Sequence, residues 1–476
     1  SFDYIYVIDL HGNSNRKEVC PDRSKDENVF DIQQGVCICI CIKLSEQSAK
    51  KKVCQVFHSD LFGTREVKYG FLSKARFSDV KFKEVYPKKP DYLFQNVDYS
   101  LRDIYDKGFS VNELFSLGSV GIVTARDGLS VDFDAVNLKN RIDDFRKLDT
   151  ELARQKYGLG KDVRDWKVSW AQNDVNQNAI LNGGLDTSKI VPLMYRPFDK
   201  RFTLYTGTSR GFVCYPRDEV MRNFITGENI GLATGRSNKS DTCDHFYAVD
   251  CMMEAKCAER TTQSAVFPLY TYSYAAGNRI KNINMNSEIL SRIADVISVP
   301  FVAADEKKDS TMKCFTEKDL LGYIYGILYC NEYREKYAEF LKADFPKICF
   351  PETAEHFFEI ARLGNQLVEL HLMKQKVELS EGITFFDADR VIEKPKFKDE
   401  KVFINKSSYF SGVTESDWSL SIGGYQPLQR WYKDRKGRAI TNSEIDYYMQ
   451  IVEVMKRTDS IMNEISTVYA KFEKEH

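Results

Sequence analysis

Residues 423–438 read Gly-Gly-Tyr-Gln-Pro-Leu-Gln-Arg-Trp-Tyr-Lys-Asp-Arg-Lys-Gly-Arg, and this stretch says more about the chain than any other. Gly423 and Gly424 allow a sharp backbone turn before its basic part, and Gly437 allows another near its end. Guanidinium forks can bind a polyanion, and an aromatic ring can stack on a base or sugar. A solvated turn with one buried tryptophan has the same composition, so both interpretations stay open. The side chains concerned are Arg430, Trp431, Lys433, Arg435 and Arg438.

Length and charge limit the kind of protein. The chain has 476 residues, enough for roughly two to four domains. Its 68 Lys and Arg balance 69 Asp and Glu, so with a net charge of -1 any basic surface must be local. The sequence contains no signal peptide and no apolar run of transmembrane length. We therefore expect a soluble protein of the cytoplasm.

The cysteine pattern points to packing and not to metal binding. The 12 Cys include no pair of CxxC motifs at zinc spacing. Cys37, Cys39 and Cys41 alternate within an apolar run, so they are expected to project from one face of a strand. We expect them to act as small hydrophobic side chains in a reduced core.

The chain changes character twice along its length. Apolar runs at residues 4–10, 36–43 and 53–57 predict strands of a sheet covered on both faces. From 76 to 189 the pattern is mixed and more polar. From residue 190 onward, aromatic segments alternate with stretches of helical period. We predict three parts: residues 1–75, a connecting region over 76–189, and a larger domain over 190–476.

Long helices are predicted in the last part. Residues 317–341 show helical period, and in 354–374 the apolar side chains fall near one stripe. Thr353 suits the start of that helix, and Ser443 suits the start of a last helix ending near residue 469. Together with the strands, these helices predict a mixed α/β (α+β) fold.

Motifs that would identify an enzyme are missing. The six histidines are too widely separated to form a ligand set by spacing, and the sequence has no nucleophile elbow. No phosphate loop of the GxxxxGK[ST] type occurs, and Gly158 and Gly160 before Lys161 fit a turn. We expect no catalytic residue, no metal and no bound cofactor in this chain.

Four segments together resemble the C-terminal specificity region of type ISP restriction-modification enzymes. These enzymes join a nuclease, a helicase-like motor, an adenine-N6 methyltransferase and a target recognition domain in one chain. The segments occur in the family's order: Tyr-Arg-Pro-Phe-Asp-Lys-Arg at 195–201, Phe-Pro-Leu-Tyr at 267–270, the Tyr-rich stretch 323–346, and 423–438. The resemblance implies that 190–476 is a target recognition domain.

The front of the chain resembles the end of the family's methyltransferase domain. The matching segments are 8–13 and 28–36, and residues 118–127 resemble the link to the recognition domain. The family's methyltransferase also needs a Gly-rich turn for S-adenosylmethionine and an Asn/Asp-Pro-Pro-Tyr/Phe turn for the target base. No Pro-Pro occurs here, and no proline follows Asn or Asp. We therefore expect both elements upstream, residues 1–75 to be an incomplete methyltransferase-like part, and the chain to be a C-terminal piece of a larger protein.

The resemblance implies double-stranded DNA as a partner, beside the methyltransferase and motor domains of the same full-length protein. The target base must leave the stack for methyl transfer, so a separate domain must hold the duplex around it. Lys and Arg bind phosphates, while Arg, Asn and Gln read base edges. The predicted DNA-contact residues are Arg126, Arg196, Arg201, Arg210, Arg217, Arg236, Asn238, Lys239, Gln426, Gln429, Arg430, Lys433, Arg435 and Arg438.

These residues have structural alternatives. Arg196 and Arg201 flank Asp199, so an internal Arg–Asp pair that fixes a corner is an equal expectation. The loop 235–239 follows an apolar run, where base readers occur, but it could also be a hairpin tip. A family motif that is shared across different targets should bind the DNA backbone or build the fold. We therefore expect 423–438 to position DNA and not to read bases.

Three functions remain open from the sequence. The first is a DNA recognition module of an adenine-N6 methyltransferase, inactive as a methyltransferase alone. The second is a subunit that completes a methyltransferase in trans. The third is a protein-interaction module whose helices at 354–374 and 443–470 dock the motor.

Overall fold

The computed structural model describes residues 2–14, 18–22, 24–44, 53–89, 92–95, 99–240, 242–307 and 313–473. The chain forms two compact units, residues 1–104 with 239–241, and residues 105–238 with 242–476. The predicted boundaries at 75 and 190 stay predictions, because a division into compact units does not test them.

Unit 1 contains a four-stranded sheet in the order β2-β1-β3-β4. The central strand β1 (Tyr4–Asp9) pairs antiparallel with β2 (Cys37–Ile42) and parallel with β3 (Gln55–Asp60). β4 (Lys83–Val85) closes the order, and the helices are α1 (Arg65–Leu72), η2 (Phe77–Asp79) and most of α2 (Tyr99–Tyr105). The three predicted strands are therefore confirmed.

The predicted burial of the three alternating cysteines is wrong. β2 is an edge strand, and Cys37, Cys39 and Cys41 are all exposed on it. The alternation itself holds, since the Sγ atoms of Cys39 and Cys41 are 3.7 Å apart on one face. Alternation fixes which side chains share a face of a strand, but it does not determine whether anything covers that face.

Unit 2 holds the larger core, built on three four-stranded sheets with the orders β14-β10-β11-β7, β13-β12-β15-β6 and β19-β22-β21-β20. Short two-stranded pairs, β16-β17, β18-β5 and β8-β9, complete the strand pairing. The strands are β5 (Phe109–Ser110), β6 (Ser119–Val120), β7 (Val131–Asp132), β8 (Ile180–Leu181), β9 (Gly184–Leu185), β10 (Ile190–Arg196), β11 (Asp199–Leu204), β12 (Gly231–Gly235), β13 (Phe246–Val249), β14 (Met252–Met253), β15 (Ser264–Pro268), β16 (Tyr270–Ala275), β17 (Asn278–Ile283), β18 (Lys347–Ile348), β19 (Phe385–Phe386), β20 (Lys396–Lys398), β21 (Lys401–Phe403) and β22 (Tyr409–Ser411).

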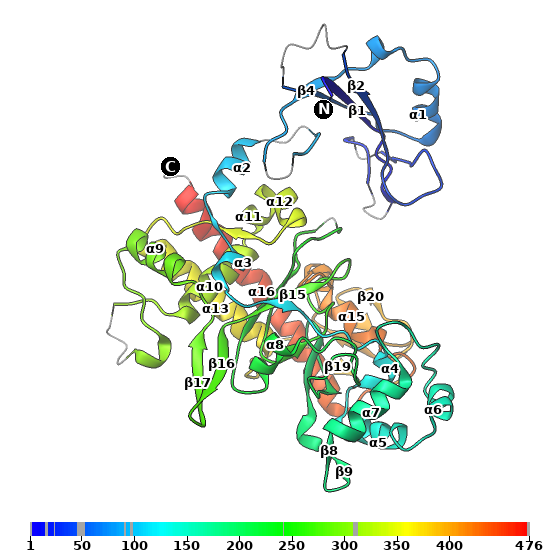
Figure 1. Ribbon diagram of the computed structural model, residues 1–476, viewed down its shortest axis with the longest axis vertical. Helices are drawn as coiled ribbons and strands as arrows, with labels where there is room; N and C mark the ends of the chain where they lie inside the picture. The colour runs from blue at the N-terminus through cyan, green and yellow to red at the C-terminus, as the bar shows by residue number, and fades with distance from the viewer. Residues whose placement is uncertain are drawn as a thin grey trace. The chain divides into compact units, whose positions relative to one another are not determined.

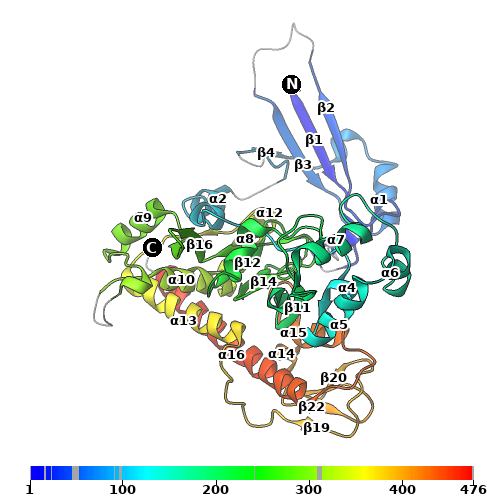
Figure 2. The same cartoon turned by 60° about the horizontal axis from the view of Figure 1, so that its bottom comes forward.

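Helices pack around these sheets, and the longest, α16, runs beside α13 in Figures 1 and 2. The α-helices of unit 2 are α3 (Val111–Leu114), α4 (Asp127–Ser130), α5 (Ala135–Phe145), α6 (Thr150–Lys156), α7 (Val168–Asn178), α8 (Asp218–Met221), α9 (Ser287–Ile297), α10 (Glu317–Tyr329), α11 (Asn331–Lys336), α12 (Ala338–Ala343), α13 (Ala354–Leu372), α14 (Glu415–Ser419), α15 (Pro427–Lys433) and α16 (Asn442–Glu473). Three short 3-10 turns are η3 (Thr187–Lys189), η4 (Arg222–Phe224) and η5 (Ala304–Glu306).

Helices α10 and α13 cross at glycines, which lets their backbones approach closely. A Cβ on Gly364 of α13 would overlap the carbonyl oxygen of Gly322 on α10, and one on Gly326 would lie 2.7 Å from Ile360 Cγ2. Any larger side chain at Gly364 would therefore separate the two helices. The contact buries Tyr323 and Tyr325 completely.

The architecture confirms the predicted mixed α/β fold with long helices. Thr353 caps α13, since its hydroxyl accepts from the His356 amide at 3.1 Å. None of the described helices has the length and apolarity needed to cross a membrane.

Candidate nucleic-acid interface

The 423–438 segment folds as a tight turn followed by helix α15. Gly423 (φ 57°) and Gly424 (φ 72°) adopt left-handed conformations, and a Cβ on Gly423 would lie 2.7 Å from Pro197 Cγ. Pro427 stands at the start of α15, where its missing amide hydrogen costs no helical hydrogen bond. The segment therefore packs directly on the 195–201 corner, and glycine is required for that approach.

One face of α15 is buried. Leu428, Trp431 and Tyr432 pack toward α16, where the Tyr448 ring lies 4.9 Å from both aromatic rings. The Tyr448 hydroxyl also donates to the Leu428 carbonyl at 3.0 Å. The predicted single buried tryptophan is thus one part of an aromatic cluster.

Beside this cluster lies an ionic network, the arginine frame, formed by the buried Asp199, Arg201 and Arg435 and by the partly exposed Asp434 and Glu444. Arg201 donates to Asp199 at 2.6 Å and to Asp434 at 2.5 Å, and Arg435 donates to the other Asp199 oxygen at 3.3 Å. Arg435 also lies 3.4 Å from Glu444 and is only 5% exposed. The frame ties the 195–201 motif to the 423–438 motif and to the start of α16.

Two carboxylates of the frame, Asp434 and Glu444, are held in the charged form. Burial raises the pKa of Asp434, but hydrogen bonds from Arg201 and Arg430 outweigh burial and bring that pKa below its ordinary value. Burial likewise raises the pKa of Glu444, but the hydrogen bonds from Arg438 and the Thr441 amide, together with the charges of Arg438 and Arg435, bring that pKa below its ordinary value. Phe133 packs against this charge, with its ring centre 4.3 Å from the Arg201 guanidinium and 4.4 Å from that of Arg435.

Arg430 and Arg438 extend the frame toward solvent. Arg430 donates to Asp434 at 3.0 Å, and Arg438 donates to both oxygens of Glu444. Arg430 is mostly buried, while the Arg438 side chain is 38% exposed.

Three other predicted contact residues are also engaged inside the protein. Arg196 forms an ion pair with Glu254. Arg126 donates to the Leu159 and Lys161 carbonyls at 2.6 and 3.2 Å. Asn238 is 2% exposed and donates to the Thr242 carbonyl at 2.7 Å.

The remaining predicted arginines lie nearer the surface. Arg210 is exposed and 3.8 Å from Asp165, and Arg217 is half-buried at the start of α8. Arg236 is 73% exposed and pairs with Asp344 at 2.9 Å. Lys239, four residues after the end of β12 at Gly235, is exposed.

The other side of α15 faces a shallow depression, the lysine hollow, with a volume of about 290 Å³. Residues 429 and 433 lie two positions from Trp431 in either direction, so at about 100° per residue they are on the opposite face of the helix. The hollow is lined by Glu393, Lys394, Pro395, Trp418, Gln429, Tyr432, Lys433 and Lys436. Of the predicted glutamines, Gln429 donates to the Trp418 carbonyl at 3.0 Å, while Gln426 is exposed and donates to the Ser419 carbonyl at 3.2 Å.

The prediction from the sequence missed Lys394, Lys436 and Trp418 as members of this surface. A signal was available in the composition: residues 390–438 contain eleven Lys or Arg and six Asp or Glu, in a chain that is otherwise close to neutral. This excess locates the local basic surface that the balanced overall charge left open.

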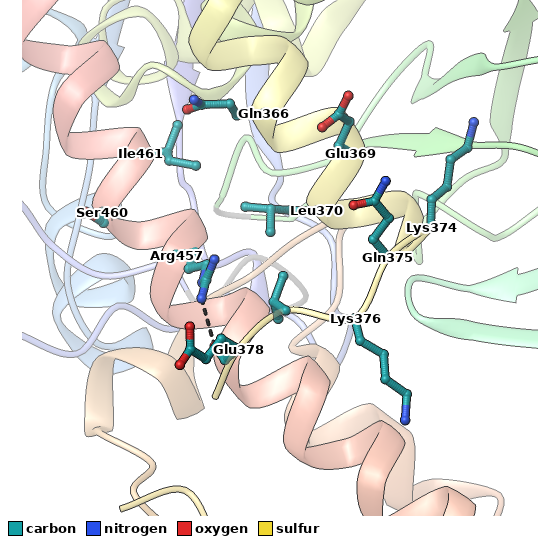
Figure 3. Close-up of a pocket in the computed structure, with 11 residues that line it drawn as sticks. Gln366, Glu369, Leu370, Lys374, Gln375, Lys376, Glu378, Arg457, Ser460 and Ile461 are labelled. Atoms are coloured by element: carbon teal, nitrogen blue, oxygen red, sulfur yellow. Dashed lines mark hydrogen bonds between the residues drawn. The ribbon is translucent and has the colours of Figure 1, made fainter. Parts of the chain in front are cut away.

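A larger cavity lies elsewhere, between α13, α16 and residues 374–378, and has a volume of about 690 Å³ (Figure 3). Leu370 and Ile461 project toward each other inside it, whereas Lys374 and Lys376 extend away. Arg457 donates to the Glu378 carbonyl at 2.7 Å and to Glu453. Acidic and basic side chains line the cavity together, and this mixed charge does not suit a phosphate backbone.

Solved structures share this fold. The DNA-bound ATP-dependent Type ISP restriction-modification enzyme LlaBIII superposes with a TM-score of 0.66 at 20% identity, covering 98% of this chain and 31% of that chain. A nuclease-deletion mutant of the Type ISP enzyme LlaGI, in complex with a DNA substrate mimic, gives 0.63 at 19% identity, covering 97% and 37%. The DrdV–DNA complex gives 0.66 at 20% identity, covering 98% and 47%.

The fold is thus that of a part of restriction-modification enzymes, and the chain spans less than half the length of each of these proteins. Residues 113–464 match the model of the Type ISP C-terminal specificity domain, so the chain belongs to that family. The predicted family resemblance is confirmed. No curated protein matches the sequence.

Proposed function

We propose that this chain is a DNA recognition module of a restriction-modification enzyme. It would hold the duplex for an adenine-N6 methyltransferase whose cofactor and base-binding motifs lie in another part of the full-length protein. Family membership and the DNA in the three related structures support this function. The observation that carries it is the basic surface formed by residues 390–438, next to a frame whose arginines are already paired.

The position of each predicted residue suggests a division of roles. Arg196, Arg201, Arg435 and Asn238 are buried or paired inside the protein, so we assign them to positioning the DNA-binding surface. We assign the exposed residues to contact with DNA: Arg210, Arg236, Lys239, Gln426 and Lys433. Arg126, Arg217, Gln429, Arg430 and Arg438 are half-buried. Exposed loop residues such as Arg236 are the better candidates for base readers.

Fluorescence anisotropy with a labelled random-sequence duplex tests the proposal. A phosphate-binding surface predicts that affinity falls steeply, by orders of magnitude, between about 50 and 200 mM salt. Absence of binding at low salt would contradict it. Calorimetric titration with S-adenosylmethionine should give no heat, and clear binding would show that the cofactor site lies within this chain.

The groove in Figure 3 favours a second candidate, a protein-docking module for the motor domain. Leu370 and Ile461 project into the groove from α13 and α16, the two helices that the sequence predicted as docking elements. This candidate predicts binding to the motor domain and no measurable affinity for duplex DNA. The same anisotropy series therefore separates the two functions.

A further inference from the structure

The lysine hollow differs from the arginine frame in its unpaired charge. Lys394, Lys433 and Lys436 are exposed, and within the described part of the chain none of them forms an ion pair with a carboxylate. Every arginine of the frame, by contrast, contacts at least one carboxylate. Three neighbouring ammonium groups that form no ion pair repel one another, so an anion bound between them would be stabilised.

An ordered aromatic wall stands beside these lysines. Trp418 is half-buried and stacks on Phe397, with ring centres 5.8 Å apart and planes at 14°. The Gln429 side chain holds the Trp418 carbonyl at 3.0 Å from the α15 side. The wall is therefore fixed before any ligand arrives, which lowers the entropy cost of binding.

Size and charge limit the ligand. The volume of about 290 Å³ is just below the volumes of small-molecule sites, which begin at ~300 Å³. Glu393 is the one acidic side chain among those that line the hollow, so three positive groups face one negative group. Such a site suits one phosphodiester with its sugar and is too small for a base pair.

We propose that the lysine hollow binds one backbone phosphate of duplex DNA, with the neighbouring sugar against Trp418. This inference rests on the proposed DNA-binding function and names the site that grips the backbone. Lysine ammonium groups hold phosphates as point charges and carry no sequence information. The hollow would therefore contribute equally to binding of every sequence.

The test is a salt series of anisotropy measurements on the triple variant Lys394→Ala/Lys433→Ala/Lys436→Ala. Because each neutralised phosphate contributes about 0.9 to the slope of log affinity against log salt, loss of the one phosphate held in the hollow should make the slope shallower by about 1. The matched control removes three exposed lysines on other elements, Lys147→Ala/Lys318→Ala/Lys374→Ala, and should change the slope much less. Thermal unfolding of both variants should coincide with that of the wild-type protein.

Failure of this inference is separable from failure of the proposed function. If the wild-type protein binds duplex DNA and the two triple variants show equal slopes, the hollow is not the phosphate site, while DNA binding stands. If the wild-type protein binds no duplex, the proposed function is wrong. Binding of a short oligothymidylate then tests the hollow alone. Equal binding of that oligonucleotide to wild-type and triple variant, or none to either, overturns the inference.

Discussion

The arginine frame and the lysine hollow lie on opposite sides of one short helix, and they use positive charge differently. On the frame side, Arg201 and Arg435 are desolvated and satisfied by Asp199, Asp434 and Glu444. On the hollow side, Lys433 and Lys436 remain in solvent without a carboxylate partner in the described chain. A basic motif in a sequence can thus hold a fold together on one face and be available to a polyanion on the other.

The largest effect is expected from breaking the frame at Arg435. Arg435→Leu leaves Asp199 and Glu444 with fewer partners in a buried site, which should lower the free energy of unfolding by about 3–5 kcal/mol. Urea unfolding followed by circular dichroism measures this loss. Arg435→Lys, which keeps the charge but not the fork, should lose less. A loss below about 1 kcal/mol for Arg435→Leu would show that the frame is not structural.

Acid should weaken the buried region through its histidines. Burial lowers the pKa of His245 and His356 to about 4 and that of His371 to about 3. The unfolded chain takes up these protons near pH 6.5, before the folded protein does, so the free energy of unfolding falls as pH drops from about 6.5 toward 4. Each histidine contributes up to about 1.4 kcal/mol per pH unit, and this stability is fully present above pH 6.5.

His356→Phe isolates one of these groups. His356 is 4% exposed and packs near Tyr323, so a phenyl ring fits its apolar surroundings. Chemical unfolding at pH 7, 6 and 5 measures the free energy of unfolding. This free energy should fall less steeply with decreasing pH in the variant than in the wild-type protein, because the variant's unfolded state takes up one proton fewer. An unchanged dependence would mean that His356 titrates normally in the folded protein.

The smallest effect on stability is expected at the surface pair of Arg236 and Asp344. Both side chains are well exposed, so Arg236→Ala should change the free energy of unfolding by less than about 1 kcal/mol. The same variant should weaken duplex binding if Arg236 contacts DNA. A large loss of stability in this variant would contradict the expectation that exposed ion pairs contribute less to stability than buried ones.

Local pattern made much of the fold predictable. The stripe of apolar residues and Thr353 predicted α13 at 354–374, and the structure places it at Ala354–Leu372. The helix predicted at 317–341 is divided into α10, α11 and α12, because Cys330 and Tyr337 leave the helical conformation. The last helix begins with Thr441 and not Ser443 as its cap, since the Glu444 amide donates to the Thr441 hydroxyl at 3.3 Å.

The site was less predictable because its partners are distant in sequence. The Asp199–Arg201 pair is local, and an internal Arg–Asp pair was one of two expectations from the sequence. Arg435, by contrast, donates to Asp199 across a separation of 236 residues in the chain. Lys394 joins Lys433 only through the folding of the β20–β21 region onto α15. Contacts between residues so distant in sequence cannot be predicted from motif spacing. Only the charge excess of 390–438 therefore indicated a basic surface.

The most direct test compares the two faces of α15 in one experiment. The slope of log duplex affinity against log salt is measured for the Arg435→Lys protein and for the Lys394→Ala/Lys433→Ala/Lys436→Ala protein, at a temperature where both are folded. We predict that Arg435→Lys keeps the wild-type slope, while the slope of the triple variant becomes shallower by about 1. The reverse result would be a reduced slope for Arg435→Lys and an unchanged slope for the triple variant. It would contradict the conclusion that the arginines stabilise the fold and the lysines bind the DNA backbone.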